Sequence, residues 1–357
     1  MERIQFAIVG AGWRAAFYFQ IAKALPEVFR VCAAVEPDPA RAAAVRETWG
    51  VAVVPDLTSL KAAAEPEFLV LCLPQPILPE MIRQAADLGY FVLSETFEAK
   101  TTEELTAFYR SVSDPARVQV SEQYWYQPVH EARLNLLKTG VIGAVTQAQI
   151  AVGHGYHGTS LIRKYLGIGY ENCRIGGKIF RNPIVRGPGR QGYPEKEELV
   201  EDQQQFAVFD FGGKWAVFDF TEEQYFSLIR APRVLLRGER GEIENNTVRY
   251  LTDFRTPVEY DLRRVVSGAN GSMGAPHIVG ITAADRWYYR NPREPARLSD
   301  DELAIAKVLE KMGAYVRGGE AFYPLQESCQ DQYLSIMMKK AFASGSVVET
   351  ETQCWAE

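Results

Sequence analysis

Two glycines near the start of the chain have the spacing of a phosphate-binding turn. Gly10 and Gly12 follow an apolar run at residues 4–9, and Ala15 opens an apolar-periodic stretch three residues later. Gly10 permits a tight turn, Gly12 lets the main chain approach a pyrophosphate, and Ala15 allows close packing of helix on strand. The unpaired N–H groups of the helix N-terminus then face the phosphates. We expect this strand, turn and helix, with Ala11 in the turn, to bind a dinucleotide.

An acidic residue follows the second apolar run at the distance that such a cofactor requires. Residues 31–35 are apolar and lead to Glu36, about 25 residues past the first glycine. A carboxylate there accepts hydrogen bonds from the hydroxyls of the adenosine ribose and repels a 2′-phosphate. Arg41 could bind such a phosphate, but Glu36 argues against it. The expected cofactor is therefore NAD rather than NADP.

Two side chains within the turn are further cofactor candidates. Arg14 can reach a phosphate, and Trp13 can cover the nicotinamide. The alternative for both is that they face solvent or pack locally. We include both in the expected cofactor-binding set.

Length and composition describe a globular protein of two domains. The 357 residues exceed one ordinary core, and 47% hydrophobic with 24% charged residues is typical of soluble proteins. A net charge of −6 without a long basic run argues against a nucleic-acid partner. No stretch has the roughly 18 apolar residues of a membrane helix, and the chain starts in a strand rather than a signal peptide. Five widely spread cysteines are typical of reduced thiols, so we expect a cytoplasmic protein.

The first third of the chain alternates strand-like and helix-like segments. Residues 68–73 are apolar at every position, as in a strand that is covered on both faces. Strand–helix alternation predicts parallel strands with right-handed crossovers. We therefore predict an α/β fold with an N-terminal Rossmann domain, a doubly wound parallel sheet that binds NAD, at residues 1–121.

The pattern changes in residues 122–357, where we predict an α+β domain for substrate binding and oligomerisation. Short turns between apolar runs, such as Gly212-Gly213, indicate a large and mostly antiparallel sheet. Residues 182–198 are expected to form a surface loop, and residues 267–275 a flexible loop that covers the site. The expected helices lie at 129–137, 300–316 and 324–343, and the expected strands at 146–152, 174–180, 203–209, 214–220, 233–237, 242–251 and 258–262.

This order of domains and motifs resembles the Gfo/Idh/MocA oxidoreductase family. The family includes glucose–fructose oxidoreductase and inositol dehydrogenase, and it typically acts on sugars and polyols with NAD(P). The motifs that carry the resemblance are Leu71-Cys72-Leu73-Pro74, the segment from Gly89 to Glu95, Leu136 to Gly143, His157 with Leu166-Gly167, Tyr323-Pro324-Leu325, Gln332-Tyr333-Leu334 and Trp355-Ala356. The resemblance implies that Leu73, Pro74 and Glu95 line the cofactor site and that Gln123 contacts the nicotinamide ribose.

The chain departs from the residues with which this family moves a proton. The resemblance implies a Glu-Lys-Pro motif, a histidine, and an aspartate four residues before that histidine. Here Thr96 stands in place of the lysine and Phe97 in place of the proline. Gly153 stands in place of the aspartate, and Ser160 replaces another frequent aspartate. Only His157 remains of the three usual participants, and a cation that lowers the pKa of the alcohol is lost.

A substitute for the missing groups lies close to this histidine in the sequence. His157 is the expected general base, because the ordinary pKa of histidine suits proton transfer near neutral pH. Tyr156 or His154 is expected to share a hydrogen-bonded relay with it, and Arg163 or Lys164 to restore positive charge or bind an acidic substrate group. The alternative is an ordinary helix-cap or core histidine. No carboxylate or cysteine completes a metal cluster here, so we expect no metal.

Two aromatic residues at the start of the second domain are substrate candidates. Tyr124 and Trp125 could stack on the faces of a sugar, and interdomain core packing explains the same cluster equally well. We also expect a homo-oligomer, a dimer or tetramer, because a sheet covered by helices on one face needs a partner on the other.

Three functions fit these observations. The first is an NAD-dependent dehydrogenase that moves a hydride between nicotinamide and a carbinol carbon of a sugar, sugar acid or cyclitol. The second is a lyase or glycosidase that cycles its NAD without net redox change. The third is a non-catalytic NAD-binding sensor, to which the loss of the usual lysine and aspartate would point.

Overall fold

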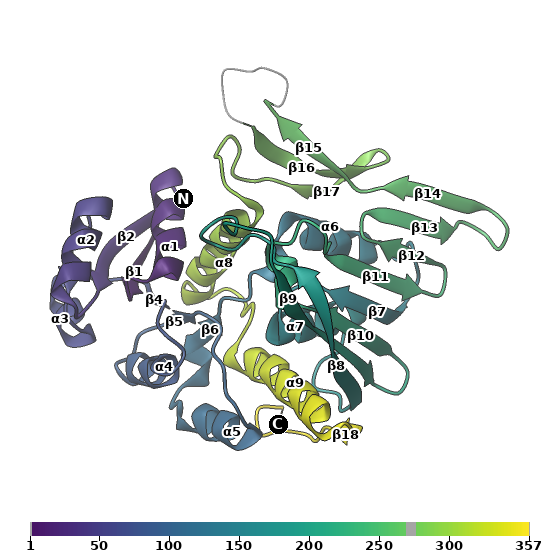
Figure 1. Ribbon diagram of the computed structural model, residues 1–357. Coiled ribbons are helices and arrows are strands. Elements are labelled where there is room, and N and C mark those ends of the chain that lie inside the picture. Colours follow the sequence, from purple (N-terminus) through teal and green to yellow (C-terminus); the bar gives the residue numbers. More distant parts are fainter. Residues whose placement is uncertain (1, 269–275, 357) are drawn as a thin grey trace. The chain divides into compact units, whose positions relative to one another are not determined.

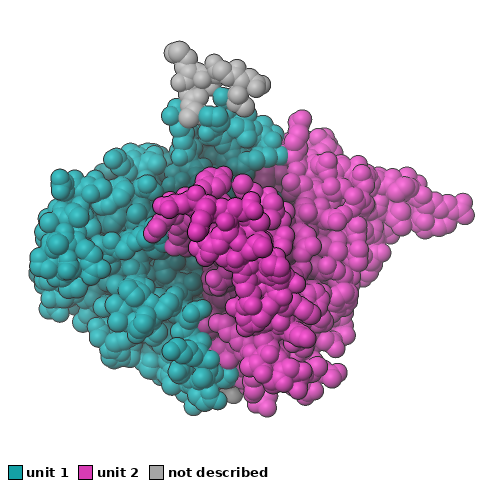
Figure 2. Space-filling view, in the orientation of Figure 1, with its two compact units in different colours: residues 1–130, 264–280, 290–329 teal, residues 131–263, 281–289, 330–357 magenta. Residues whose placement is uncertain are grey.

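The computed structural model describes residues 2–268 and 276–356, which divide into two compact units (Figure 2). Unit 1 comprises residues 1–130, 264–280 and 290–329, and unit 2 comprises residues 131–263, 281–289 and 330–357. Most of the loop that we expected at 267–275 lies outside the described residues. Among the described helices, none is long and apolar enough to cross a membrane.

Unit 1 is built on a six-stranded parallel sheet (Figure 1). The strand order is β3-β2-β1-β4-β5-β6, so the direction of winding reverses between β1 and β4. Every residue of β4 is buried, as expected for a strand with both faces covered. The predicted doubly wound sheet is therefore confirmed. The strands are β1 (Ile4–Val9), β2 (Phe29–Val35), β3 (Val53–Val54), β4 (Phe68–Leu71), β5 (Val92–Ser94) and β6 (Val118–Val120).

Helices cover this sheet, and one of them comes from far along the chain. At Gly313 in α8 (Asp300–Val316), a Cβ atom would lie only 2.7 Å from Cδ1 of Ile4 in β1, so the helix packs directly on the central strand. Ser299 caps this helix with a reciprocal capping box to Glu302. The other helices of unit 1 are α1 (Trp13–Ala24), α2 (Pro39–Trp49), α3 (Leu57–Ala63), α4 (Leu78–Asp87) and α5 (Thr102–Ser111), with short 3₁₀ turns η1 (Pro115–Arg117) and η2 (Tyr124–Tyr126).

Unit 2 is built on a nine-stranded sheet in the order β14-β13-β12-β11-β7-β10-β9-β8-β18. Its pairs are antiparallel except β7 with β10, which confirms the predicted large and mostly antiparallel sheet. The strands are β7 (Val145–Ala151), β8 (Arg174–Val185), β9 (Leu199–Asp210), β10 (Trp215–Phe220), β11 (Arg233–Gly238), β12 (Gly241–Glu244), β13 (Thr247–Leu251), β14 (Pro257–Asp261) and β18 (Val348–Glu349).

One face of this sheet packs against helices through small residues. In α7 (Gly155–Leu166), a Cβ at Gly158 would lie 2.2 Å from the ring of Phe218 in β10. A Cβ at Gly155 would lie 2.6 Å from Oγ of Ser335 in α9 (Leu325–Ser344). Glycine therefore lets α7 lie close to both the sheet and α9. The helix α6 (Pro128–Leu137) and the turn η3 (Glu222–Tyr225) complete the described helical elements of this part of the chain.

Three expectations about the elements were wrong. Residues 242–251 form two strands instead of one, because Asn245 adopts a left-handed conformation (φ 52°) and starts a hairpin. Pairing of β8 with β9 continues to Val185, so the loop expected at 182–198 starts later. A three-stranded sheet of β15 (Arg263–Ser267), β16 (His277–Ala283) and β17 (Arg286–Arg290) was not expected at all.

Candidate active site

The glycine turn between β1 and α1 has the geometry of a phosphate-binding turn. Gly10 has φ 99°, and a Cβ there would lie 2.4 Å from the carbonyl oxygen of Cys72, so only glycine fits. Around Gly12, no described atom lies within 4 Å of the position of a Cβ, so the backbone is open to a ligand. Gly12 has no side chain to cap α1, whose first residues are Trp13, Arg14 and Ala15. The N–H groups of this helix N-terminus and the lack of acidic side chains in its first turn fit a pyrophosphate.

Glu36 lies at the end of β2, where an adenosine ribose is recognised in dinucleotide folds. Its side chain is buried, and Oε1 accepts a hydrogen bond from the backbone N–H of Asp38 at 3.0 Å. Nη2 of Arg41 lies 3.3 Å from the same oxygen, and the rest of that arginine is largely exposed. A fixed carboxylate thus marks the adenosine side of the sheet, on the β2 side of β1.

The segments after β4 and β5 lie at the same carboxyl-terminal edge of the sheet. Leu73, half-buried, approaches Gly10, and Pro74 is exposed. Gln75 connects this loop to the next: its Nε2 donates to the carbonyl of Thr96 at 2.9 Å, and its Oε1 accepts from the N–H of Glu98 at 2.8 Å. The segment around Thr96 is therefore held in place, although this residue cannot carry the charge of a lysine.

Arg14 turns its side chain toward two carboxylates. Its Nε lies 2.9 Å from Oε1 of Glu95, and its Nη1 lies 3.3 Å from Oδ2 of Asp301 in the first turn of α8. With the amide of Gln123 oriented to satisfy both of its ends, this residue accepts from Nη2 of Arg14 at 3.2 Å and donates to the carbonyl of Ser121 at 2.9 Å. Arg14, Glu95 and Gln123, which were predicted separately, thus form one cluster.

A tyrosine and a serine extend this cluster through hydrogen bonds. Tyr18 in α1 donates to Oε1 of Glu95 at 2.5 Å, and its hydroxyl lies 3.0 Å from Oγ of Ser121. Burial, and then the charge of Glu95, raises the pKa of Tyr18, so the phenol stays neutral. Trp13, in contrast, is 56% exposed and contacts Phe17 edge-on at 5.1 Å.

A second buried acid lies next to this cluster. Glu122 is fully buried and accepts a hydrogen bond from the backbone N–H of Tyr124 at 3.0 Å. Burial raises its pKa well above the ordinary value, and the nearby charges of Glu95 and Asp301 add to the effect. The bond from Tyr124 and the charge of Arg14 oppose this shift without cancelling it. Glu122 therefore tends to hold a proton.

The sequence did not assign functional roles to Tyr18, Ser121, Glu122 or Asp301. Asp301 is separated from its partner Arg14 by 287 positions, and no local pattern connects them. Tyr18 lies one helical turn after Arg14 on the same face of α1, and this spacing is the signal that could have found it.

The two aromatic substrate candidates differ in their surroundings. Trp125 is buried, and its ring meets that of Tyr323 edge-on with 4.8 Å between centroids. Tyr124 is half-buried, and its ring lies 6.3 Å from that of His130. Trp125 thus takes part in the core of unit 1, and Tyr124 has the more accessible ring.

In unit 2, the N-terminus of α7 brings two histidines together. His154 precedes the helix, and its ring centroid lies 4.8 Å from that of His157 in the first turn. The ring of Tyr156 lies 5.3 Å from that of His157. The backbone N–H of His154 donates to the hydroxyl of Tyr225 at 2.9 Å. The three residues predicted to share a relay thus have adjacent rings, and His157 is 7% exposed.

The basic residues further along α7 have different surroundings. Arg163 is 2% exposed, and its Nη1 lies 2.8 Å from Oδ1 of Asp331 in α9. Its Nε and Nη2 donate to the carbonyl of Gly169 at 2.9 and 2.6 Å. Arg163 therefore anchors α7 to α9 and to the loop that follows α7. Lys164 is exposed.

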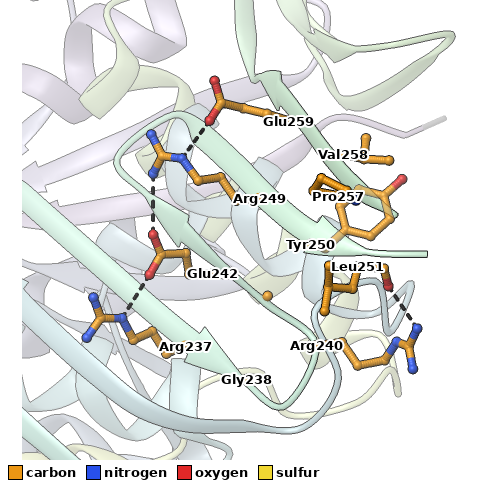
Figure 3. A pocket seen from close by; sticks show the side chains of 11 residues that line it. Arg237, Gly238, Arg240, Glu242, Arg249, Tyr250, Leu251, Pro257, Val258 and Glu259 are labelled. Carbon is orange, nitrogen blue, oxygen red and sulfur yellow. Dashed lines mark hydrogen bonds and ion pairs between the residues drawn. The ribbon is translucent and has the colours of Figure 1, made fainter. Parts of the chain in front are cut away.

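A groove of about 550 Å³ in unit 2 lies at the β12–β14 edge of the large sheet (Figure 3). Its arginines are engaged: Nε of Arg249 lies 2.6 Å from Glu259, and Nε of Arg237 lies 2.8 Å from Glu242. The lining residues include none of the predicted site residues.

The glycine turn, the fixed carboxylate after β2 and the parallel sheet define an NAD-binding Rossmann domain. Residues 4–121 match the Gfo/Idh/MocA family model, described as an oxidoreductase family with an NAD-binding Rossmann fold. This match over residues 4–121 confirms the expected resemblance to the family and NAD as the cofactor. A search of curated proteins finds no match.

Solved structures extend the likeness of fold over nearly the whole chain. An oxidoreductase from Agrobacterium radiobacter, in complex with NAD⁺, L-tartaric acid and magnesium, has a TM-score of 0.69 at 15% identity, covering 98% of each chain. A putative myo-inositol dehydrogenase from Sinorhizobium meliloti has a TM-score of 0.67 at 16% identity, covering 98% of this chain and 100% of that one. Levoglucosan dehydrogenase in complex with NADH and levoglucosan has a TM-score of 0.69 at 14% identity, with the same coverage.

Proposed function

We propose that the protein is an NAD-dependent dehydrogenase that oxidises a carbinol carbon of a sugar, sugar acid or cyclitol, with His157 as the acid/base. The observation that carries this proposal is the pairing of an NAD-binding domain of an oxidoreductase family with the His154–His157 pair at the start of α7. The domain would bind NAD, which is the hydride acceptor, and the histidine pair provides a side chain that exchanges protons near neutral pH.

The proposed reaction separates a proton and a hydride. A bound NAD⁺ would supply the acceptor for the hydride of the carbinol carbon. His157 takes the proton from the hydroxyl, so that an alcohol becomes a ketone and atoms and charge balance. His154 and Tyr156, whose rings are adjacent to that of His157, would orient it and share its proton. Thr96 stands where the resemblance implies a lysine, so the proposed reaction has no lysine from this motif to assist His157.

The cofactor-binding residues that we propose are supported by the geometry of unit 1. Gly10, Ala11 and Gly12 would hold the pyrophosphate, and Glu36 the adenosine ribose. Around the nicotinamide end, we propose Trp13, Arg14, Leu73, Pro74, Glu95 and Gln123. The carboxylate of Glu36 favours NAD over NADP.

The substrate class is supported by the proteins that share this fold. Levoglucosan dehydrogenase has been solved with levoglucosan and with L-sorbose, and other neighbours are described as myo-inositol dehydrogenases. All of these compounds are polyhydroxylated. We propose that Tyr124 and Lys164 contact the substrate, because their side chains are accessible. Trp125 and Arg163 have structural contacts that make them weaker candidates.

A fluorescence screen for NADH tests the proposal. The purified protein is given NAD⁺ and a panel of sugars, sugar acids and cyclitols, beside His157→Ala and, as a control, His277→Gln. His277 is a matched control because it belongs to unit 1 and lies near Glu294 instead of the other histidines. We expect turnover that is lost in His157→Ala and retained in His277→Gln. Bound NAD⁺ without NADH from any compound would contradict the proposal and favour internal redox cycling or an NAD sensor.

We also propose that the protein is a homo-oligomer that associates through the open face of the large sheet. Several large apolar side chains on β8, β9 and β10 are exposed on the face opposite α7 and α9, namely Phe180, Phe206, Val208 and Trp215. Light scattering after gel filtration is expected to give a multiple of 40.1 kDa, and Val208→Asp a monomer. A monomeric native protein would contradict this proposal.

A further inference from the structure

Arg14 connects the phosphate-binding turn to the ends of two other strands. It lies two residues after Gly12, in the first turn of α1. Its guanidinium contacts Glu95, directly after β5, and Gln123, three residues after β6. One side chain thus links the place where the pyrophosphate binds with the carboxyl ends of β5 and β6.

These strand ends belong to the nicotinamide half of the domain. Glu36 marks the adenosine half at the end of β2, on one side of β1. In the strand order β3-β2-β1-β4-β5-β6, the second mononucleotide-binding half lies over β4, β5 and β6. Glu95 and Gln123, after β5 and β6, are therefore the residues of this half that would hold the nicotinamide end of the cofactor.

The position of Arg14 is fixed from several directions. Glu95 and Asp301 contact its guanidinium from two different elements, and Glu95 is itself held by Tyr18. Burial opposes the charge of Arg14, but Glu95, Tyr18 and Asp301 outweigh it and raise the pKa of the guanidinium. The side chain therefore stays charged, and its contacts direct it toward the nicotinamide half and away from the phosphates.

We propose that Arg14 is the positioning residue of the nicotinamide half of the site: it holds Glu95 and Gln123 in the arrangement that receives the nicotinamide ring. Arg14 thereby places a positive charge beside Glu95, next to a position where Thr96 carries none. This inference rests on the proposed cofactor site but does not depend on the identity of the substrate.

Removing Arg14 is therefore expected to weaken the binding of the nicotinamide half of the cofactor and not of the adenosine half. ADP-ribose contains the adenosine, the pyrophosphate and a ribose but lacks the nicotinamide ring. Removing Arg14 should leave the glycine turn and Glu36 intact, so ADP-ribose should still bind. Glu95 and Gln123 would lose their charged partner, and the additional affinity contributed by the nicotinamide should be lost.

Titration calorimetry with ADP-ribose and NAD⁺ tests this inference on the full-length protein. The variants are Arg14→Met, the conservative Arg14→Lys, and Arg41→Met as a matched control on the adenosine side. For Arg14→Met, we expect an NAD⁺ affinity about tenfold lower and an ADP-ribose affinity within about twofold of the native value. Arg14→Lys should recover part of the loss, because it keeps the charge but not the planar donor set. Arg41→Met should change both affinities by the same factor.

Several outcomes would overturn the inference. Equal losses for both ligands in Arg14→Met would mean that Arg14 acts on the phosphates or on the fold. Unchanged NAD⁺ affinity, or a native protein that binds NAD⁺ no more tightly than ADP-ribose, would mean that there is no nicotinamide contact to position. A native protein that binds neither ligand would refute the cofactor site itself. In contrast, retained ADP-ribose binding without turnover of any sugar would refute the dehydrogenase proposal and not this inference.

Discussion

Neutralising Asp331 is expected to destabilise unit 2 strongly. The Arg163–Asp331 pair connects α7 to α9, with side chains that are 2% and 0% exposed and a 2.8 Å contact. Asp331→Asn keeps the shape of the side chain but removes its charge, so the buried guanidinium loses its counter-charge. Breaking one partner of such a pair costs about 3–5 kcal/mol. For a unit of this size, that corresponds to a fall in Tm of about 6–20 °C.

Urea unfolding of four proteins measures this effect: the native chain, Asp331→Asn, Arg163→Met and the double variant. Both single variants leave one buried charge, whereas the double variant leaves none. We therefore expect the double variant to lose at least about 2 kcal/mol less than the sum of the single losses. ADP-ribose binding, which reports on unit 1, should persist in all four. A loss below about 1 kcal/mol for Asp331→Asn, or additive losses, would refute the reasoning.

Three further predictions concern single residues. Glu36→Ser should raise the ratio of NADP to NAD affinity at least about tenfold in calorimetry, because a carboxylate that repels a 2′-phosphate is removed; an unchanged ratio would exclude Glu36 from the ribose site. Glu122→Gln should be more stable than the native protein at pH 8, with the difference shrinking toward pH 4 in urea titrations. Burial raises the pKa of Glu122, so the folded state keeps a proton on this side chain at pH values where the unfolded state has lost it. The free energy of unfolding of the native protein therefore falls as the pH rises above about 4.3, the ordinary pKa of glutamate. Equal slopes in the two proteins would contradict this. Gly158→Ala should lower stability by about 1–3 kcal/mol in thermal unfolding, because the added Cβ would lie 2.2 Å from Phe218, whereas Gly213→Ala, in open space, should change it by less than about 0.5 kcal/mol. Similar losses of stability for the two variants would show that Phe218 moves away from the added Cβ at little cost.

The Rossmann domain could be predicted because its signals are local. The turn needs glycine at position 10, where any Cβ would meet the carbonyl of Cys72, and β4 is apolar throughout because both its faces are covered. The strand–helix alternation then restricts the topology. Similarly, His154, Tyr156 and His157 could be predicted to have adjacent rings, because they lie within four positions at one helix end.

The remaining features depend on contacts between distant positions. Arg163 was a reasonable substrate candidate by sequence, but its partner Asp331 lies 168 positions away. Arg14 was expected at a phosphate, and its contact with Asp301 requires that α8 pack on β1. The strands β15, β16 and β17 lack the regular alternation that would have marked them. In each case the deciding interaction is tertiary, and a local pattern does not contain it.

The central claim is that a hydride moves between the carbinol carbon of a polyhydroxylated substrate and bound NAD. Its most direct test uses a turned-over compound from the panel with deuterium on the oxidised carbon, followed by mass spectrometry of the cofactor. The account predicts that the deuterium is recovered in NADH released to solution and that His157→Ala abolishes the transfer. Deuterium that is absent from the released cofactor, or that returns to the product while the NAD pool stays oxidised, would contradict it.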